Sequence, residues 1–179
     1  MRAGLRLAGR LKHPDFVDIV GQVAKHPEEV VRRLVAETLA SIGTAASFRR
    51  LISMVDDTDR DVRVVVYRAL ARRPFRGALS ALQGAITVKD LEKKGQREKR
   101  ALFQAFGAVA GTDGVAMLAP LLRGKNPSGQ RPSSHTRACA ATALGVIATP
   151  DARAALDRAA RDRDPVVRSA VSAALRGDR

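Results

Sequence analysis

A segment of about a dozen residues recurs five times along the chain, and this repeat limits the possible folds more than any other feature. Each copy starts near a basic residue, continues with apolar residues at helical spacing, and ends with a large apolar residue and small ones. The large residues lie 31 to 38 positions apart, and a basic residue precedes each by seven. The copies are VRRLVAETLASIG (31–43), VRVVVYRALARR (62–73), EKRALFQAFGAVAG (98–111), TRACAATALGVIA (136–148) and VRSAVSAALRG (167–177). The large residues are Leu39, Leu70, Phe106, Leu144 and Leu175, and the basic ones are Arg32, Arg63, Lys99, Arg137 and Arg168.

Each copy predicts an amphipathic helix, because its apolar residues fall at i, i+3, i+4 and i+7. A more weakly patterned helix precedes each copy, and prolines and capping residues mark several helix starts. One such hairpin cannot bury both apolar faces, whereas stacked hairpins bury a continuous core. The sequence therefore predicts an all-α, right-handed α-solenoid of about five helix–turn–helix repeats. The expected first helices are 14–25, 45–55, 75–87, 113–123 and 150–161, and the expected N-caps include Thr112, Ser134, Thr149 and Asp164.

Composition agrees with closely packed helices. Of the 179 residues 31 are Ala, and aromatic residues make up only 3%, whereas a sheet would need more β-branched and aromatic side chains. The single Cys excludes a disulfide framework and a thiolate zinc site. No run approaches the ~18 apolar residues of a membrane span, and the N-terminus lacks the apolar core of a signal peptide. We therefore expect a cytoplasmic protein that does not act at a membrane.

The chain resembles the short bacterial HEAT-like repeats, also called PBS-lyase HEAT-like repeats. The resemblance rests on turns of the D-x-x-V-R kind followed by A-L-G-x-I endings, and it covers almost the whole chain. It implies the α-solenoid fold and says little about function. The segments that carry it are DRDVRVVVYRAL (59–70), ATALGVIATPDARAAL (141–156) and RDRDPVVRSAVSAAL (161–175).

The repeat divides the chain into one domain, 1–179, with a partial repeat at its start. In the partial repeat, Leu7 lies 32 residues before Leu39 and would be its large apolar residue. Because the chain begins inside a repeat, two interpretations stay open: a complete protein, or the C-terminal part of a longer one. The expected boundaries are 1–12 for the partial repeat and approximately 13–43, 44–74, 75–111, 112–148 and 149–179 for the full repeats.

No pattern of residues indicates catalysis. Cys139 lies among core-like alanines, and the three His residues fall in separate turns without clustered carboxylates. Phosphate-binding and dinucleotide-binding glycine loops and the G-x-S-x-G motif are absent. Some HEAT-like proteins resemble DNA glycosylases, but that resemblance implies aromatic residues, Trp among them, and this chain has no Trp. We expect no enzyme activity, no cofactor, no metal and no small-molecule substrate, with a glycosylase as a remote alternative.

The basic residues near the start of the second helices form a column that we call the basic column: Arg32, Arg63, Lys99, Arg137 and Arg168. These residues could either pair with acidic residues of the turns or contact a partner. In the family that the chain resembles, such an Arg commonly pairs with a turn Asp, and Asp57 and Asp162 each precede a column residue by six. His26 and Lys93 take that place in the first and third repeats, and Gln130 lies seven residues before Arg137, so Arg32, Lys99 and Arg137 are expected to be freer. Tyr67 and Phe103 lie three residues before the large residues, which predicts exposure beside the column. The candidate partner-binding residues of the concave face are Arg63, Tyr67, Arg68, Lys99, Arg100 and Phe103.

Two repeats are lengthened between their helices, at 87–99 and 123–135. Insertions of this kind fall on one edge of a solenoid. Basic residues of the two loops could therefore form one anion-binding patch that neither loop makes alone. The alternative is a pair of solvated loops. The candidate anion-binding residues are Lys89, Lys93, Lys94, Arg97, Arg123, Lys125 and Arg131.

The net charge of +14 points to an anionic partner. Arg outnumbers Lys 25 to 7, which a GC-rich coding sequence would also explain. A solenoid offers an extended concave surface and no enclosed pocket, which favours recognition over catalysis. We therefore expect an interaction scaffold or adaptor that binds another protein. The alternative is a nucleic-acid-binding module that uses the basic surface.

Overall fold

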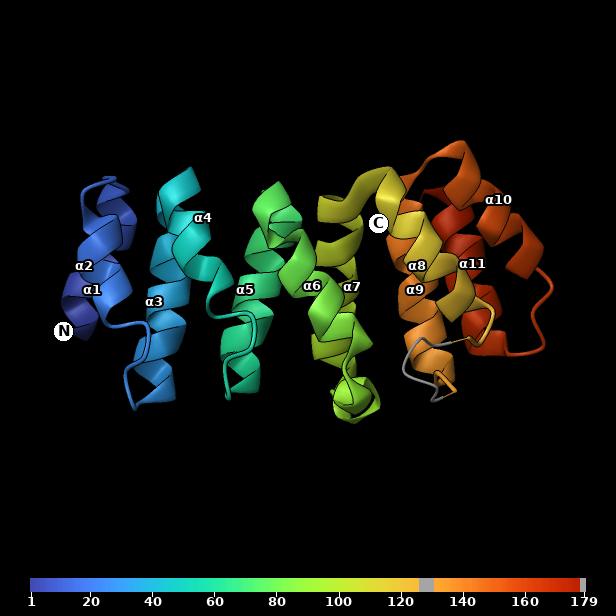
Figure 1. Ribbon diagram of the computed structural model, residues 1–179, viewed down its shortest axis with the longest axis horizontal. Helices are drawn as coiled ribbons and strands as arrows, with labels where there is room; N and C mark the ends of the chain where they lie inside the picture. The colour runs from blue at the N-terminus through green and yellow to red at the C-terminus, as the bar shows by residue number, and fades with distance from the viewer. Residues whose placement is uncertain (126–130, 178–179) are drawn as a thin grey trace.

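The computed structural model describes residues 1–125 and 131–177, and every regular element in them is a helix. Helix α1 (Arg2–Leu11) is followed by helical hairpins stacked side by side from one end of the molecule to the other (Figure 1). The predicted α-solenoid is thereby confirmed. The first helices of the hairpins are α2 (Phe16–Gln22), α4 (Ala45–Ile52), α6 (Leu79–Thr87), α8 (Val115–Leu122) and α10 (Pro150–Ala159). The second helices are α3 (Glu29–Ile42), α5 (Arg60–Arg72), α7 (Gln96–Ala110), α9 (Ser134–Ile147) and α11 (Pro165–Arg176).

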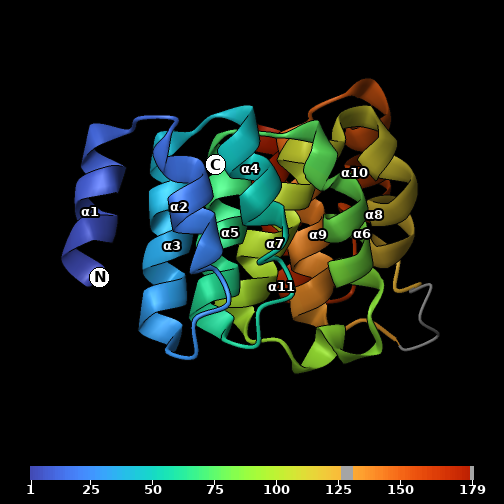
Figure 2. The same ribbon diagram turned by 60° about the vertical axis from the view of Figure 1, so that its left-hand side comes forward.

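The helices form two layers. Consecutive second helices contact one another, and the first helices cover one side of the layer that they make (Figure 2). Short 3₁₀ turns lead into or out of some first helices, at Arg76–Ala78, Lys89–Lys93 and Gly111–Gly114. Thr149 and Asp164 cap α10 and α11 as predicted, whereas Ser133, one residue earlier than predicted, caps α9.

The apolar residues that define the repeat fill the core between the layers. Leu39, Leu70, Phe106 and Leu144 are fully buried. Leu175 is only partly buried, because α11 has packed helices on one side and an open face on the other. The prediction for the first copy was wrong, since Leu7 is 53% exposed.

Small residues at the helix crossings explain the error at Leu7. A Cβ atom added to Gly107 would lie 2.8 Å from the carbonyl oxygen of Ala143, and one added to Gly145 would lie 2.9 Å from the Cβ of Ala174. Each of these glycines directly follows the large residue of its repeat. Gly9 makes the same crossing with Thr38, so Ala8 is the true equivalent of Leu39.

This close approach predicts opposite effects for two Gly-to-Ala substitutions. In Gly107→Ala, overpacking against the α9 backbone costs ~1–3 kcal/mol, more than the ~1 kcal/mol that Ala contributes to helix propensity. Gly84→Ala, in α6, meets no atom within 4 Å and should raise the free energy of unfolding by ~0.5–1 kcal/mol. Urea unfolding should rank the proteins Gly84→Ala, wild type, Gly107→Ala. Equal stability of the two variants would contradict the crossing.

One stretch, Gln96–Leu122, is long enough for a membrane span and contains an 18-residue window with a mean hydropathy of 1.5. Half of its most apolar window is buried inside the solenoid. The stretch is also divided, because α7 ends at Ala110, Gly111 follows with φ of +55°, and a 3₁₀ turn precedes α8. In this fold it supplies two neighbouring core helices.

Candidate interaction surface

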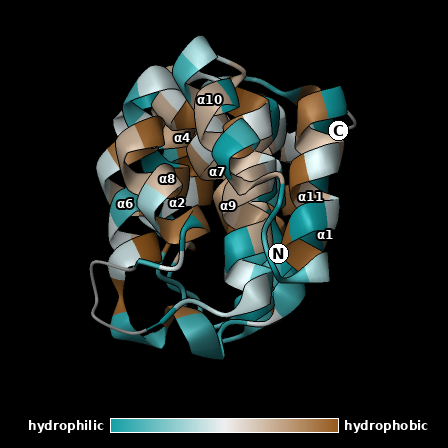
Figure 3. Ribbon diagram, turned by 90° about the vertical axis from the view of Figure 1, so that its right-hand side faces the viewer, coloured by the Kyte–Doolittle hydropathy of each residue, from teal (hydrophilic) through white to brown (hydrophobic). Residues whose placement is uncertain are grey.

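The second-helix layer curves inward. In the view along the solenoid, the end helices α1 and α11 project beyond α7 and α9 on this side (Figure 3). Each inner second helix contacts the second helices before and after it, and α3, α7 and α9 also contact their own first helices. A narrow strip of each helix is left exposed, and these strips together form the concave face.

Arginines dominate the part of the concave face that α1 to α7 provide. Arg68, Arg97 and Arg100 surround a hollow of 350 Å³ together with Gln96, Ala101 and Gln104. Helices α1, α3 and α5 carry further exposed arginines, at repeat positions equivalent to those of the hollow's arginines or one helical turn away. Two carboxylates pair with them, since Glu28 bonds Arg2 and Glu37 lies 3.9 Å from Arg33. These further arginines are Arg2, Arg6, Arg10, Arg33 and Arg72.

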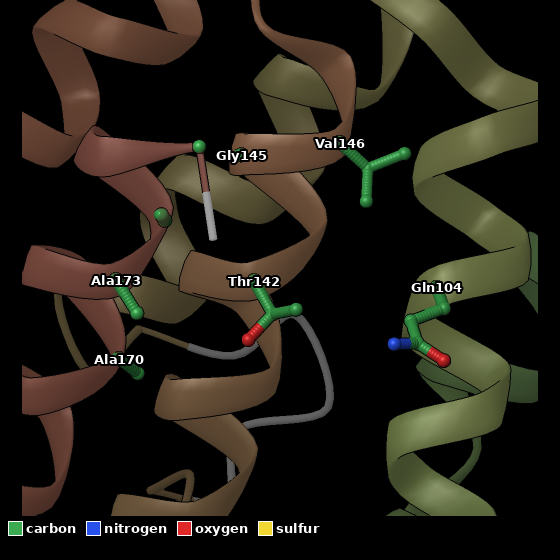
Figure 4. Close-up of a pocket in the computed structure, with 8 residues that line it drawn as sticks. Gln104, Thr142, Gly145, Val146, Ala170 and Ala173 are labelled. Carbon is green, nitrogen blue, oxygen red and sulfur yellow. The ribbon is translucent and has the colours of Figure 1, made fainter. Parts of the chain in front are cut away.

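The concave face changes character over α9 and α11. A shallow hollow of 710 Å³ runs from Arg100 and Gln96 across both helices and is lined mainly by small and neutral side chains. A smaller hollow lies beside it, where Gln104 of α7 faces Thr142 and Val146 of α9 (Figure 4). Among the described residues, the positive charge of this face is therefore concentrated toward α1.

The predicted exposure of Tyr67 and Phe103 was wrong. Both side chains are buried, with 0% and 1% of their surface exposed. The Tyr67 hydroxyl donates a hydrogen bond to the Val55 carbonyl oxygen at 3.1 Å, and burial raises its pKa. Position −3 from the large residue lies on a side of the helix that packs against neighbouring elements, so neither ring can contact a partner.

Arg63 and Lys99 are also structural, which corrects their assignment to the partner-binding face. Arg63 forms a two-pronged ion pair with Glu98, with distances of 2.7 and 3.0 Å. Lys99 is almost fully buried and donates to Glu92 at 2.7 Å and to the Thr136 hydroxyl at 2.9 Å. Of the predicted concave residues, Arg68 and Arg100 are therefore exposed and lie together.

The basic column joins each repeat to the next. Arg32 donates to the carbonyls of His26 and Pro27 and reaches Asp57 of the following repeat at 2.8 Å. Arg63 likewise donates to the carbonyls of its own turn while it holds Glu98. Arg137 pairs with Asp162 of the following repeat. Arg32, Lys99 and Arg137 were expected to be freer, but all three form ion pairs. Gln130 lies outside the described residues.

The carboxylates that pair with the basic column are held in their charged form. Burial alone would raise the pKa of Glu98, but hydrogen bonds from Arg63 and from Lys94, 3.0 Å away, bring it below its ordinary value. The same balance of burial and cationic hydrogen bonds lowers the pKa of Glu92. The Glu98 bond in turn raises the pKa of Arg63.

The two inserted loops meet at one edge. The backbone N–H of Ser133 donates to Glu92 at 3.3 Å (Figure 1). Lys94 is tied to Glu98 and Lys93 to Asp90, 2.8 Å away. Arg97 lies on α7 in the concave face, so the structure does not place all seven residues in one patch. Exposed residues of the predicted patch also include Lys89, Arg123, Lys125 and Arg131, and residues 126–130 lie outside the described part of the chain.

Chemical groups suited to catalysis are not gathered on this surface. Cys139 is buried, and burial raises the pKa of its thiol to about 11, so the nucleophilic thiolate is scarce near neutral pH. In residues 1–125 and 131–177, no three His, Cys, Asp or Glu side chains come together as a metal-binding group.

The comparison with known families supports the repeat assignment. Residues 2–71, from α1 into α5, match the family model of HEAT repeats. No curated protein matches the chain. The matched region contains Arg68 but not Arg97 and Arg100.

Proposed function

We propose that the chain is a non-enzymatic protein-interaction module whose concave face binds an acidic segment of a partner protein. HEAT repeats are commonly protein-interaction scaffolds, and residues 2–71 match this family. The spacing of 31 residues in the repeats without an inserted loop supports the short HEAT-like type. The hollow between Arg68, Arg97 and Arg100 carries the proposal, because three exposed guanidinium groups converge on it.

The composition of the face favours a protein over single-stranded nucleic acid. Proteins that hold single strands stack successive bases on exposed aromatic side chains. Tyr67 and Phe103 are buried, and none of the exposed concave residues named above is aromatic. Duplex nucleic acid needs only phosphate contacts and stays the alternative outcome.

The test uses a triple variant, Arg68→Ser with Arg97→Ser and Arg100→Ser, and a matched loop variant, Lys89→Ser with Arg123→Ser and Lys125→Ser. Both remove three exposed charges. We expect a protein partner to be captured from source-cell lysate by the wild type and the loop variant, with or without nuclease. The triple variant should bind that purified partner at least tenfold more weakly.

A nucleic-acid function would give the opposite pattern. Captured material would disappear on nuclease treatment, and duplex DNA would bind tightly at physiological salt. Six phosphate contacts would give a log–log salt slope near −5, from about −0.9 per contact. Binding lost in the loop variant and kept in the triple variant would overturn the proposed function.

A further inference from the structure

The hollow between α5 and α7 is built entirely of donors on its polar side. Its lining residues are Arg68, Gln96, Arg97, Arg100, Ala101 and Gln104. Every polar side chain among them can donate hydrogen bonds, and none is acidic. Within residues 1–125 and 131–177, no carboxylate pairs with Arg68, Arg97 or Arg100. Three exposed positive charges therefore share one hollow without a counter-charge from the described chain.

The basic column shows how this fold treats the arginines that it pairs internally. Arg32, Arg63 and Arg137 each meet a carboxylate of the following repeat. The arginines of the hollow also come from two successive repeats, because Arg68 lies on α5 and the other two lie on α7. Among the described residues they have no such pair, which leaves their charge available to a bound anion.

The number of guanidinium groups favours a phosphate monoester over a carboxylate. A carboxylate carries one negative charge and two oxygens, and a single arginine can engage both oxygens at once. A phosphorylated serine or threonine carries a charge of about −1.5 to −2 near pH 7 and three acceptor oxygens. Three guanidinium groups match the second group better in both charge and number of acceptors. Arginine clusters are a recurring means of recognising phosphorylated segments.

A largely uncharged hollow continues from the arginine hollow and suits the residues beside a phosphate. The hollow of 710 Å³ over α9 and α11 shares Gln96 and Arg100 with it. Apart from Arg100 and the imidazole of His135, this second lining is uncharged. A nucleic acid that followed the concave face onto α9 and α11 would bring further phosphates to a surface with few cations. A peptide with one phosphorylated residue and neutral neighbours fits both hollows.

We propose that the hollow between Arg68, Arg97 and Arg100 binds a phosphorylated serine or threonine of a partner protein. The uncharged residues beside the phosphate lie over α9 and α11. This inference rests on the proposed function, since it names the anionic group of the partner segment that the concave face binds.

The test uses three labelled nine-residue peptides that differ only at the central residue, which is phosphoserine, serine or glutamate. Their other residues are the same small, uncharged ones. Fluorescence anisotropy would measure binding to the wild type, to Arg68→Gln/Arg100→Gln and to Arg72→Gln/Arg123→Gln. Arg72 and Arg123 are exposed and do not line the hollow, so the last variant is a matched control for the loss of two positive charges.

We expect the phosphoserine peptide to bind the wild type at least tenfold more tightly than the serine and glutamate peptides. Arg68→Gln/Arg100→Gln should weaken this binding at least tenfold, and the control variant should change it less than threefold. Inorganic phosphate should compete with the peptide but bind at least tenfold more weakly, because it lacks the flanking residues. Since all the replaced side chains are exposed, circular dichroism should be unchanged.

Several results would overturn the phosphate site. One is equal binding of the glutamate and phosphoserine peptides, or no binding of the phosphoserine peptide. Another is inorganic phosphate that binds as tightly as the peptide, which would make a free anion the occupant. Duplex DNA or phosphoinositide vesicles that bind more tightly than the peptide, and lose binding in Arg68→Gln/Arg100→Gln, would make a nucleic acid or a lipid surface the occupant.

A partner captured from source-cell lysate separates this inference from the proposed function. Phosphatase treatment should weaken binding of the purified partner at least tenfold. If the treated partner binds equally well and still depends on the three arginines, the protein-interaction function stands and the phosphate site is wrong. If the phosphoserine peptide binds as expected and no protein is captured, the phosphate site stands and the protein-interaction function loses its support.

Discussion

Truncating Leu70 to Ala should lower the free energy of unfolding by about 2–5 kcal/mol, the usual cost of removing a fully buried Leu side chain. Leu70 lies in α5 between α3 and α7 and is fully buried. The surrounding helices are fixed by their own neighbours, so the cavity cannot collapse easily. Leu175 occupies the same repeat position in α11 but is only partly buried, and Leu175→Ala should cost less than half as much.

Urea unfolding of both variants, together with hydrogen exchange resolved by repeat, would check this ranking. Leu175→Ala should increase exchange mainly in α10 and α11, whereas Leu70→Ala should weaken protection across several repeats. If Leu175→Ala were the more destabilising variant, the assignment of equivalent positions would be wrong.

Replacing Glu98 by Ala should cost about 3–5 kcal/mol near neutral pH, as expected when one partner of a buried ion pair is removed. Only 1% of the Glu98 side chain is exposed, and its carboxylate holds both Arg63 and Lys94. The substitution leaves two cations in a partly buried place without their counter-charge. Glu37→Ala is the control, because Glu37 is half exposed and 3.9 Å from Arg33, and such a surface pair contributes ~0–1 kcal/mol.

The effect of Glu98 should depend on pH in a defined direction. The pKa of Glu98 in the folded protein lies below its ordinary value, and the unfolded value is about 4.3. Its stabilisation is therefore fully present above the unfolded pKa and is lost as the pH falls through the folded pKa. The stability difference between wild type and Glu98→Ala, measured by urea unfolding from pH 7 to pH 3, should shrink in that window. A stability difference that does not change with pH would contradict the ion pairs of Glu98 with Arg63 and Lys94.

The sequence predicted the helices well because periodicity and capping are local properties. The five second helices, and the burial of Leu39, Leu70, Phe106 and Leu144, follow from a pattern that any amphipathic helix needs. The predicted exposure of Tyr67 and Phe103 was wrong because the prediction assumed that each helix has only one buried face. The inner helices α5 and α7 each contact a second helix on both sides, so Tyr67 and Phe103, three positions before the large residue, are also buried.

The partners of the basic column could not be derived from spacing within one repeat. Asp57 lies six residues before Arg63, yet its carboxylate bonds Arg32 of the preceding repeat, while its carbonyl oxygen accepts from Arg63. Whether the Asp57 carboxylate pairs with Arg32 or with Arg63 depends on how neighbouring repeats stack. The arginines of α1 do have a sequence signal, since Arg2, Arg6 and Arg10 recur every four residues, but the misplaced register at Leu7 concealed their relation to Arg68.

The bridges of the basic column also bear on how the chain unfolds. Arg32 with Asp57, Arg63 with Glu98, and Arg137 with Asp162 each span two repeats. In a linear array the contacts between neighbours determine how many repeats unfold as one cooperative block. Protonating these carboxylates weakens the coupling and leaves the backbone hydrogen bonds of each helix in place. Acid should therefore shorten the cooperative block, so that terminal hairpins open separately from the middle of the array.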